Sequence, residues 1–461
     1  MRNPVQPLRS ERPRFKSYPA YKDSGVEWLG EIPAHWEVKR LKTVASVQLS
    51  NVDKKSVEGQ EEVRLCNYTD VYYNERITAD LEFMAATATP EQARRFSLRA
   101  GDVLITKDSE SWTDIAVPAV VAEDMPGVLC GYHLAHIRPG NDCDGAFLFR
   151  AFAAMGPRDQ FQVAANGITR FGLGGDAIRT GLFALPLLTE QRAIAAFLDR
   201  ETARIDALVA RKERLIALLQ EQRTALITRA VTKGLDPTVP MKDSGVEWLG
   251  AIPAHWEVKR VKNLSRFVTS GSRGWAEHYT EEGSLFLRIG NLRTDSIDLD
   301  LSDTQLVSPP QGAEGERTRV RAGDLLISIT ALIGAVGVVL EGTPAAFVNQ
   351  HLALVRLSDK GVRPRWLGYC VLSPVGQEQL RASLYGGTKD GLSLDDIRSL
   401  AVLVPPRKEQ ERIIGILDSA GRHLDALVAK VHDAIDRLKE FRTALISAAV
   451  TGKIDVREEV A

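Results

Sequence analysis

The sequence predicts an α+β fold with two β-rich heads in tandem repeat, separated by two long helices that pair as an antiparallel coiled coil. Three observations carry this prediction. A heptad pattern of apolar residues occurs twice, a nearly invariant segment precedes each occurrence, and short β-branched runs lie in between. A chain of 461 residues is also too long for a single core, so at least two domains are expected.

The first heptad pattern lies in Glu190–Val231, where apolar residues recur at alternating spacings of four and three. This spacing makes one seam along a helix that requires a partner helix. Seven of the ten inward positions are apolar. They are Ile194, Leu198, Glu201, Ile205, Leu208, Lys212, Leu215, Leu219, Gln222 and Leu226.

Adding 219 to each number gives a second seam in which all ten positions are apolar, from Ile413 to Leu445 and including Phe441. Proline precedes and glycine follows both segments, as expected at helix limits. The second head begins where the first helix ends and finishes where the second begins. Because the termini of a compact domain tend to lie close together, we expect an antiparallel pair with one head at each end and a pseudo-twofold axis.

The segment KDSGVEWLGEIPAHWEVKRLK at 22–42 returns at 242–262 with only two of its 21 positions changed. Between this segment and the helix, the halves share only landmarks, such as RAGDVLIT at 99–106 and RAGDLLIS at 321–328. A second landmark, GYHLAHIRP against NQHLALVRL, brings His133 opposite His351. A constant frame with divergent interiors indicates two heads that meet different targets. Drift after an old duplication is the alternative.

Within each head, glycine-bounded runs such as GDVLIT, GVLCGYHLAHI, GDLLISIT and AVGVVL predict strands. Short helices are predicted at 146–154 and 365–372. The predicted domains are an N-terminal extension (1–20), a first head (21–188), a spacer helix with its linker (189–236), a second head (237–407), and a second helix with the tail (408–461).

Composition limits the possible functions. The chain has 59 Lys and Arg against 60 Asp and Glu, for a net charge of −1. Residues 263–404 hold 14 basic and 16 acidic side chains, so nucleic-acid binding would require cations gathered on one face. No run is apolar enough to span a membrane, no signal peptide is evident, and no cysteine lies in a CxxC pair. A cytoplasmic location is therefore expected.

No catalytic signature stands out. Phosphate-cradling glycine motifs, HExxH and Cys/His clusters are absent. The two Pro-Pro turns lack the aromatic residue that would stack on a flipped base. His35 and His255 are expected to be packed. The tryptophans of the repeated segment are expected to anchor the head cores, and they are Trp28, Trp36, Trp248 and Trp256.

Binding is the remaining function class, and polar or cationic side chains on loops near the landmarks are the candidates. Arg288-Ile-Gly-Asn291 combines a phosphate or guanine reader with an adenine reader. The candidate DNA-binding residues are Arg64, Asn67, Tyr68, Thr69, Lys107, Ser109, Thr169 and Arg170 in the first head, and Ser272, Arg273, Arg288, Asn291, Ser328, Thr330, Thr388 and Lys389 in the second. No catalytic or metal-binding residue is predicted.

The doubled DSGVEWLG-IPAHWEVKRLK segment, the GDVLI and GDLLI strands, and the TEQ and KEQ that open the helices resemble the DNA-specificity subunit of Type I restriction-modification systems. The resemblance covers about residues 21–455. It implies that each head reads one half of a bipartite double-stranded DNA site, while the helices set the gap. It also implies two adenine-N6 methyltransferase subunits, motor-endonuclease subunits, and S-adenosylmethionine bound by the methyltransferase partner rather than by this chain. The GITRFGLGG of the first head departs from the GGTKDGLSLDD of the second.

Two alternatives from other classes stay open: a self-contained DNA methyltransferase or nuclease with unrecognised motifs, and a structural coiled-coil scaffold. Incubation with DNA and labelled S-adenosylmethionine separates the first from a non-catalytic DNA reader. A DNA-binding selection separates the second, because a scaffold would show no sequence preference.

Overall fold

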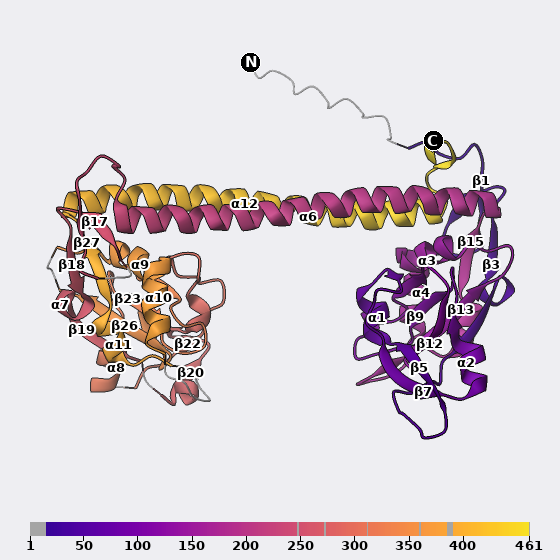
Figure 1. Cartoon of the computed structure of the whole chain (residues 1–461), viewed down its shortest axis with the longest axis horizontal. Helices are drawn as coiled ribbons and strands as arrows, with labels where there is room; N and C mark the ends of the chain where they lie inside the picture. The colour runs from indigo at the N-terminus through magenta and orange to yellow at the C-terminus, as the bar shows by residue number, and fades with distance from the viewer. Residues whose placement is uncertain are drawn as a thin grey trace, which may run out of the picture. The chain divides into compact units, whose positions relative to one another are not determined.

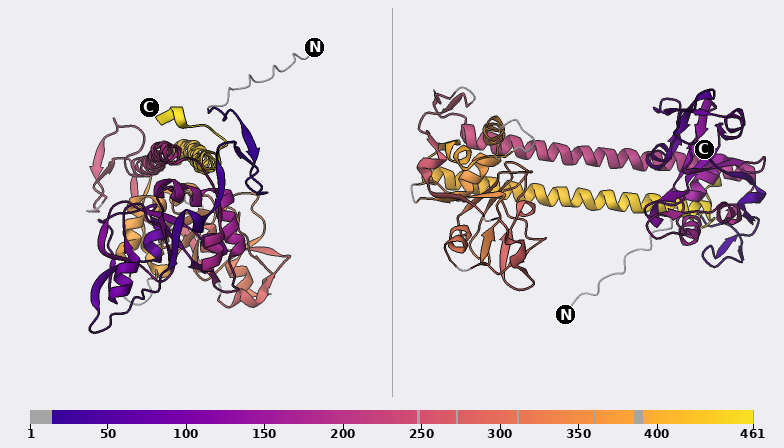
Figure 2. Two further views of the ribbon diagram at one scale, coloured as in Figure 1. Left: turned by 90° about the vertical axis from the view of Figure 1, so that its right-hand side faces the viewer. Right: turned by 90° about the horizontal axis from the view of Figure 1, so that it is seen from below.

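A computed structural model describes residues 15–460, except 247–248, 272, 311, 359–360 and 385–390. The chain forms two compact units, one containing 1–211 with 434–461 and the other 212–433. Two helices contribute to both units, α6 (Leu188–Lys233) and α12 (Arg407–Val450), and each is a single helix (Figure 1; Figure 2, right). They confirm the two predicted helices. No helix among the described residues is long and apolar enough to cross a membrane.

The first head contains a five-stranded sheet in the order β4-β13-β9-β11-β6 and a four-stranded sheet in the order β7-β5-β12-β8. β12 and β5 run parallel, which places Cys130 beside Cys66. The first sheet comprises β4 (Ala45–Leu49), β13 (Leu134–Pro139), β9 (Val103–Thr106), β11 (Pro118–Val121) and β6 (Arg76–Ile77), and the second β7 (Met84–Ala88), β5 (Glu61–Cys66), β12 (Met125–Cys130) and β8 (Ser97–Leu98).

The second head repeats this topology. Its sheet order β19-β26-β23-β24 matches β4-β13-β9-β11, and β21 pairs parallel with β25 as β5 does with β12. The predicted tandem α+β repeat is therefore present. The strands are β19 (Ser265–Ser270), β26 (Leu352–Leu357), β23 (Leu325–Ser328) and β24 (Val336–Val338), then β20 (Tyr279–Thr280), β22 (Leu306–Val307), β21 (Ser284–Leu287) and β25 (Ala346–Val348).

Short helices and ribbons complete each head. The helices are α1 (Tyr68–Tyr73), α2 (Pro90–Phe96), α3 (Gly145–Ala153), α4 (Met155–Ala164) and α5 (Gly175–Thr180) in the first head, and α7 (Val261–Leu264), α8 (Ala313–Thr318), α9 (Pro364–Leu372), α10 (Pro374–Ala382) and α11 (Leu394–Ser399) in the second. The two-stranded ribbons are β1–β2 (Tyr21–Asp23, Glu31–Pro33), β3–β15 (Glu37–Arg40, Leu182–Leu185) and β10–β14 (Asp108–Ser109, Phe171–Gly172) in the first unit, and β16–β17 (Met241–Asp243, Ala251–Pro253) and β18–β27 (Glu257–Arg260, Ala401–Val404) in the second.

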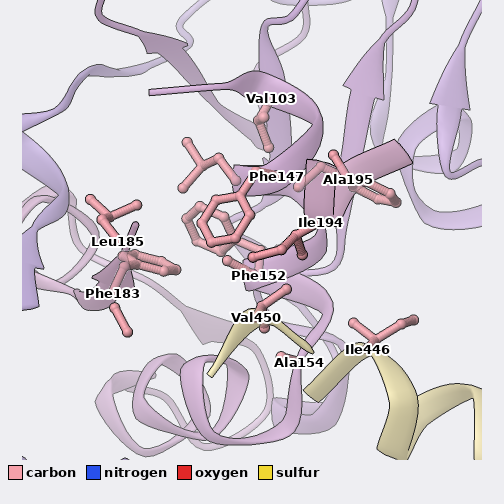
Figure 3. Close-up of a cluster of buried hydrophobic side chains, with 14 of the residues drawn as sticks. Val103, Phe147, Phe152, Ala154, Phe183, Leu185, Ile194, Ala195, Ile446 and Val450 are labelled. Atoms are coloured by element: carbon pink, nitrogen blue, oxygen red, sulfur yellow. The ribbon is translucent and has the colours of Figure 1, made fainter. Parts of the chain in front are cut away.

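The cores join each head to both long helices. In the first unit, Ile194 at the start of α6 and Val450 at the end of α12 pack in one cluster with Phe152 of α3 (Figure 3). In the second unit, Val231 at the end of α6 lies in one cluster with Ile413 at the start of α12. The helix segments are therefore antiparallel within each unit, as predicted.

The Glu-Gln pair of the TEQ and KEQ motifs fastens each helix to its head. Glu190 accepts a hydrogen bond from the indole of Trp36 at 3.2 Å, and its other carboxylate oxygen lies 2.8 Å from His35 Nε2. Gln191 bonds three backbone groups, the Asp144 amide and the carbonyls of residues 142 and 186. Gln410 makes the same three kinds of bond in the second unit.

A second fastening, which we term the helix–head clamp, repeats in both units. Arg442 near the end of α12 donates to Asp206 of α6 at 2.9 Å and to Glu75 of the first head at 2.6 Å. Its counterpart at an offset of 219 residues, Arg223 near the end of α6, donates to Asp425 of α12 and to the Asp295 carbonyl of the second head.

The aspartates of the two RAGD landmarks are structural. Asp324 is buried and accepts from Arg356 at 2.8 and 2.6 Å and from the Arg321 amide at 2.7 Å. Asp102 makes the equivalent pair with Arg138. Burial alone would raise the pKa of Asp102, but hydrogen bonds from Arg138 and His136 outweigh it and lower that pKa. These landmarks persist because they hold the strands together.

Several details differ from expectation. Leu208, Leu215 and Phe441 of the predicted inward seams are 39–43% exposed, because a helix with 3.6 residues per turn drifts by about 20° per heptad from a seven-residue repeat. Trp36 and Trp256 are fully buried as predicted, whereas Trp28 is 38% exposed. Trp248 lies outside the described residues.

The two histidines of the repeated segment were expected to be packed, and this was wrong. The side chains of His35 and His255 are 41% and 42% exposed, and each pairs with a glutamate at the start of a long helix, Glu190 or Glu409, at 2.8 Å. In each case the contact between Nε2 and the glutamate carboxylate holds the imidazole at the edge of the core rather than inside it.

Candidate nucleic-acid interface

Five of the predicted binding residues line one surface hollow of about 530 Å³ in the first head, between α1 and the β10–β14 ribbon. Residues 67–69 begin α1, which follows β5, and Ser109 lies on β10, which follows β9. Arg170 reaches the same hollow because β14, which follows it, pairs with β10. The five residues are Asn67, Tyr68, Thr69, Ser109 and Arg170.

The α1 wall of the hollow is aromatic. Tyr68 and Tyr72 stack with ring centroids 5.5 Å apart, and Tyr73 beside them is 77% exposed. Asp70 begins the helix by accepting from the Asn67 amide at 2.6 Å, which fixes the direction of α1. Burial raises the pKa of Asp70. Exposed tyrosine rings with polar tips can contact deoxyribose and base edges at once.

The opposite wall is a charged network centred on Asp108. Its Oδ2 lies 2.6 Å from Lys107 Nζ and 3.1 Å from His133 Nδ1. Arg170 Nη2 lies 3.3 Å from the same His133 nitrogen, and its guanidinium is otherwise exposed. Lys107 is only 9% exposed and sits over the Tyr132 ring at 4.7 Å. Arg170 and Lys54, which are both exposed, are therefore the cations of the hollow that a ligand can reach, while Lys107 positions Asp108.

Three candidates of the first head lie outside the lining of this hollow: Lys107, described above, Arg64 and Thr169. Arg64, on β5, is exposed and has its guanidinium 6.0 Å from the Phe83 ring centroid. Thr169 is exposed beside Arg170. Ser109 lines the hollow but is 8% exposed, with its hydroxyl 3.3 Å from the Tyr68 hydroxyl.

In the second head, two candidates have structural roles that leave nothing for base reading. Asn291 is 2% exposed, donates to the carbonyls of Asp300 and Asp303 at 2.9 and 2.8 Å, and accepts from the Arg288 amide at 2.9 Å. Ser328 is fully buried and donates to the Thr330 carbonyl at 2.7 Å. The prediction that Asn291 reads adenine was wrong, because both of its donor hydrogens and its acceptor are used within the loop.

The remaining described candidates of the second head stay accessible. Arg288 is partly exposed and lies 3.2 Å from Asp303, which is 89% exposed. The Thr330 hydroxyl lies 2.8 Å from His351 Nδ1. His351 follows the end of β25 as His133 follows the end of β12 in the first head. Arg273 is exposed. Ser272, Thr388 and Lys389 lie outside the described residues.

Sequence reasoning missed part of the first-head hollow. His133 and His351 were aligned but not proposed as contacts, and Tyr72, Tyr73 and Tyr132 were not considered. The signal was visible as the YTDVYY run directly after Asn67. Among the residues that the structure describes, no three His, Cys, Asp or Glu side chains converge as a metal site.

The architecture and the paired loop sites define the class of the chain, a double-headed DNA-specificity protein, and the comparisons name the family. Residues 307–437 match the family described as Type I restriction modification DNA specificity domain. Over these residues the chain is similar to Type I restriction-modification specificity subunits.

Named relatives agree with this assignment. The chain is 25% identical to the Type I restriction enzyme EcoBI specificity subunit of Escherichia coli, over 63% of this chain and 62% of that subunit. It is 23% identical to the EcoKI specificity subunit of Escherichia coli strain K12, over 92% of this chain and 90% of that subunit.

Solved structures share the fold. A chain from a study of complex assembly and conformational transition of the type I R-M system matches with a TM-score of 0.67 and 21% identity, covering 91% of this chain and 98% of that one. The HsdS subunit of Thermoanaerobacter tengcongensis matches with a TM-score of 0.52 and 19% identity, covering 92% and 98%.

Proposed function

We propose that this chain is the sequence-reading subunit of a Type I restriction-modification complex, with each head reading one half of a bipartite double-stranded DNA site. The observation that carries the proposal is the matched placement of polar and cationic side chains in the two heads. His133 and His351 lie at the same position of one landmark. His133 lies 3.1 Å from Asp108 and His351 lies 2.8 Å from Thr330, and these two neighbours occupy matching positions after the RAGD strands. Arg170 also contacts His133 at 3.3 Å. Different neighbours at matched positions suit different half-sites.

The chain's own groups suit binding better than chemistry. In the first head, the hollow offers hydroxyls, one amide, tyrosine faces and the cations Lys54 and Arg170, which are groups that donate to phosphates and base edges. Four carboxylates also line it, so a DNA strand would have to approach from the side of these two cations. We propose that the chain is non-catalytic and cytoplasmic. Methyl transfer would belong to two methyltransferase subunits that bind S-adenosylmethionine, and cleavage to motor-endonuclease subunits.

The long helices supply a docking surface in this proposal. Leu208, Leu215 and Leu218 of α6 are 39–44% exposed, and spacings of seven and three residues place them near one another on the helix surface. Partner helices packing on these side chains would remove the apolar surface from water at about 25 cal/mol per Å².

The experiment is methylation of a site library by the chain assembled with its methyltransferase partner, read by sequencing. Arg170→Ala is expected to relax or weaken one half-site, and Thr330→Ala in the second head the other. If either substitution altered both halves equally, one head would not read one half. If both variants methylated the same sequence motif at the parent rate, neither loop site would contact DNA.

The self-contained methyltransferase alternative is tested with the purified chain alone, DNA and labelled S-adenosylmethionine. We expect no transfer until the partner is added. Transfer by the chain alone would replace our proposal with that alternative.

A further inference from the structure

Two adjoining surface hollows lie where α12 begins in the second unit, with volumes of about 570 and 380 Å³. They share the Gly323 turn and the Arg363-Pro364 start of α9, so they form one continuous depression. We refer to the pair as the α12 groove. Its two halves differ in chemistry.

The smaller half is cationic. Five guanidinium groups line it. Among the described residues, the carboxylates beside them are Asp324 in the same lining and Glu411 at the border with the larger half. Asp324 is taken by Arg356, and Glu411 pairs with Arg363 and lies 3.6 Å from Arg407. Five cations less two anions leave a local charge of about +3. The five arginines are Arg266, Arg321, Arg356, Arg363 and Arg407.

The larger half is apolar. Val338, Val339, Leu340 and Ile414 supply its apolar lining, and Glu341 beside Leu340 adds one exposed carboxylate at its edge. Leu340 is 46% exposed although it follows a buried strand. An apolar wall directly beside several guanidinium groups suits a ligand that carries both an apolar side chain and carboxylates.

The first head lacks this combination. Ser46, Asp144 and Leu188 occupy the positions of Arg266, Arg363 and Arg407. The ion pair at the second of these positions is reversed, because Asp144 faces Arg192 at 3.7 Å where Arg363 faces Glu411. Within the part of the chain that the structure describes, the groove therefore occurs once, and its occupant does not follow the pseudo-twofold repeat.

The groove lies at the far end of the strands from the loops proposed to read DNA. β26 runs from Leu352, next to His351, to Leu357, which lines the groove. At about 3.3 Å per residue, these two ends are about 17 Å apart. A phosphate backbone would also leave the Leu340 side of the groove unused.

We propose that the α12 groove binds one acidic, leucine-bearing segment of a protein partner, with its carboxylates on Arg266, Arg321 and Arg407 and its apolar side chain between Leu340 and Ile414. Such an occupant satisfies both halves of the groove at once. Because the site is single, it is a contact separate from the proposed pair of methyltransferase docking sites. It does not depend on the DNA-reading proposal.

The test measures fluorescence anisotropy of labelled probes with the full chain at moderate salt. The probes are a short Glu/Leu peptide, the same peptide with serine in place of leucine, and a short DNA duplex of unrelated sequence. We expect the Glu/Leu peptide to bind at least about tenfold more tightly than the Glu/Ser peptide. The double variant Arg266→Glu, Arg407→Glu should weaken it by about tenfold or more, and Leu340→Asp should remove its advantage over the Glu/Ser peptide.

Two controls keep the result interpretable. Arg381→Glu, on the exposed surface of α10 in the same head, should change nothing. A Lys/Leu peptide should gain affinity for the charge-reversed double variant, which a misfolded variant could not show. The substitution Arg407→Glu should not destabilise α12, because a glutamate is favourable in the first turn of a helix. Equal binding of the Glu/Ser and Glu/Leu peptides would overturn the proposal in favour of a simple anion site. If duplex DNA competed with the Glu/Leu peptide, and the double variant abolished that competition, the groove would be a nucleic-acid surface. If the double variant bound the Glu/Leu peptide as tightly as the parent chain does, the groove would not be the binding site.

Discussion

Removing the guanidinium of the helix–head clamp should destabilise one unit and leave the other unchanged. Arg442→Ala deletes bonds to Asp206 and Glu75, whose side chains are 54% and 46% exposed. Breaking a buried ion pair costs about 3–5 kcal/mol, but partly exposed carboxylates recover hydration. We therefore expect a loss of about 2 kcal/mol. For a unit of this size, that corresponds to a fall in Tm of about 4–8 °C.

The assay is scanning calorimetry of the full chain, in which the two units should give separable transitions. Arg223→Ala removes the equivalent group from the second unit, where the arginine side chain is 10% exposed, and should lower the other transition by a similar amount. Arg214→Ala is the matched control. Its guanidinium is 64% exposed and 3.6 Å from Glu221, so the change should stay within about 0.5 kcal/mol.

If both clamp variants lower the same transition, the clamps do not belong to separate cooperative units. A second contrary result would be that neither variant lowers Tm by more than the control does. In that case the clamps would be ordinary surface ion pairs.

Three further predictions concern reading of the DNA. Exchanging residues 263–401 for the matching segment of another specificity subunit should change one half of the methylated motif only, and a change in both halves would contradict the assignment of one head to one half-site. Arg288→Ala should cost about 1–3 kcal/mol of binding free energy at one base pair if the guanidinium reads guanine. If Arg288 contacts a phosphate, the substitution should instead lower the salt slope of binding by about one. Unchanged binding across salt concentrations would exclude both roles. Inserting four residues near Gln220 and four near Lys439 lengthens each helix by about 6 Å, so the preferred gap should grow by one to two base pairs of about 3.4 Å each, whereas an unchanged gap at good activity would show that the helices do not set it.

Elements defined by local periodicity could be predicted from the sequence. The two long helices follow from heptads bounded by proline and glycine, and the helix at 364–372 from a short apolar run. The strand order could not be predicted, because the parallel pairing of β5 with β12 joins segments about sixty residues apart. Nothing in either strand's own sequence specifies that partner.

The binding residues show the same limit at the level of side chains. The hollow of the first head contains Tyr68 and Arg170 as predicted candidates, because landmark alignment placed both near strand ends. Asn291 was misjudged because an asparagine that reads a base and one that closes a loop look alike in sequence. Only the positions of the Asp300 and Asp303 carbonyls distinguish them.

The split composition of the first unit has a consequence for synthesis on the ribosome. Its core needs Leu445, Ile446 and Val450, which are translated after the whole second unit. The second unit is one uninterrupted stretch and can complete its core earlier. At about 5–20 residues per second, the first head waits on the order of ten seconds or more for its closing helix. The first head is therefore synthesised first but completes its core last. A nascent chain that stalls before Leu445 would carry a completed second unit and a first unit whose core still lacks the end of α12.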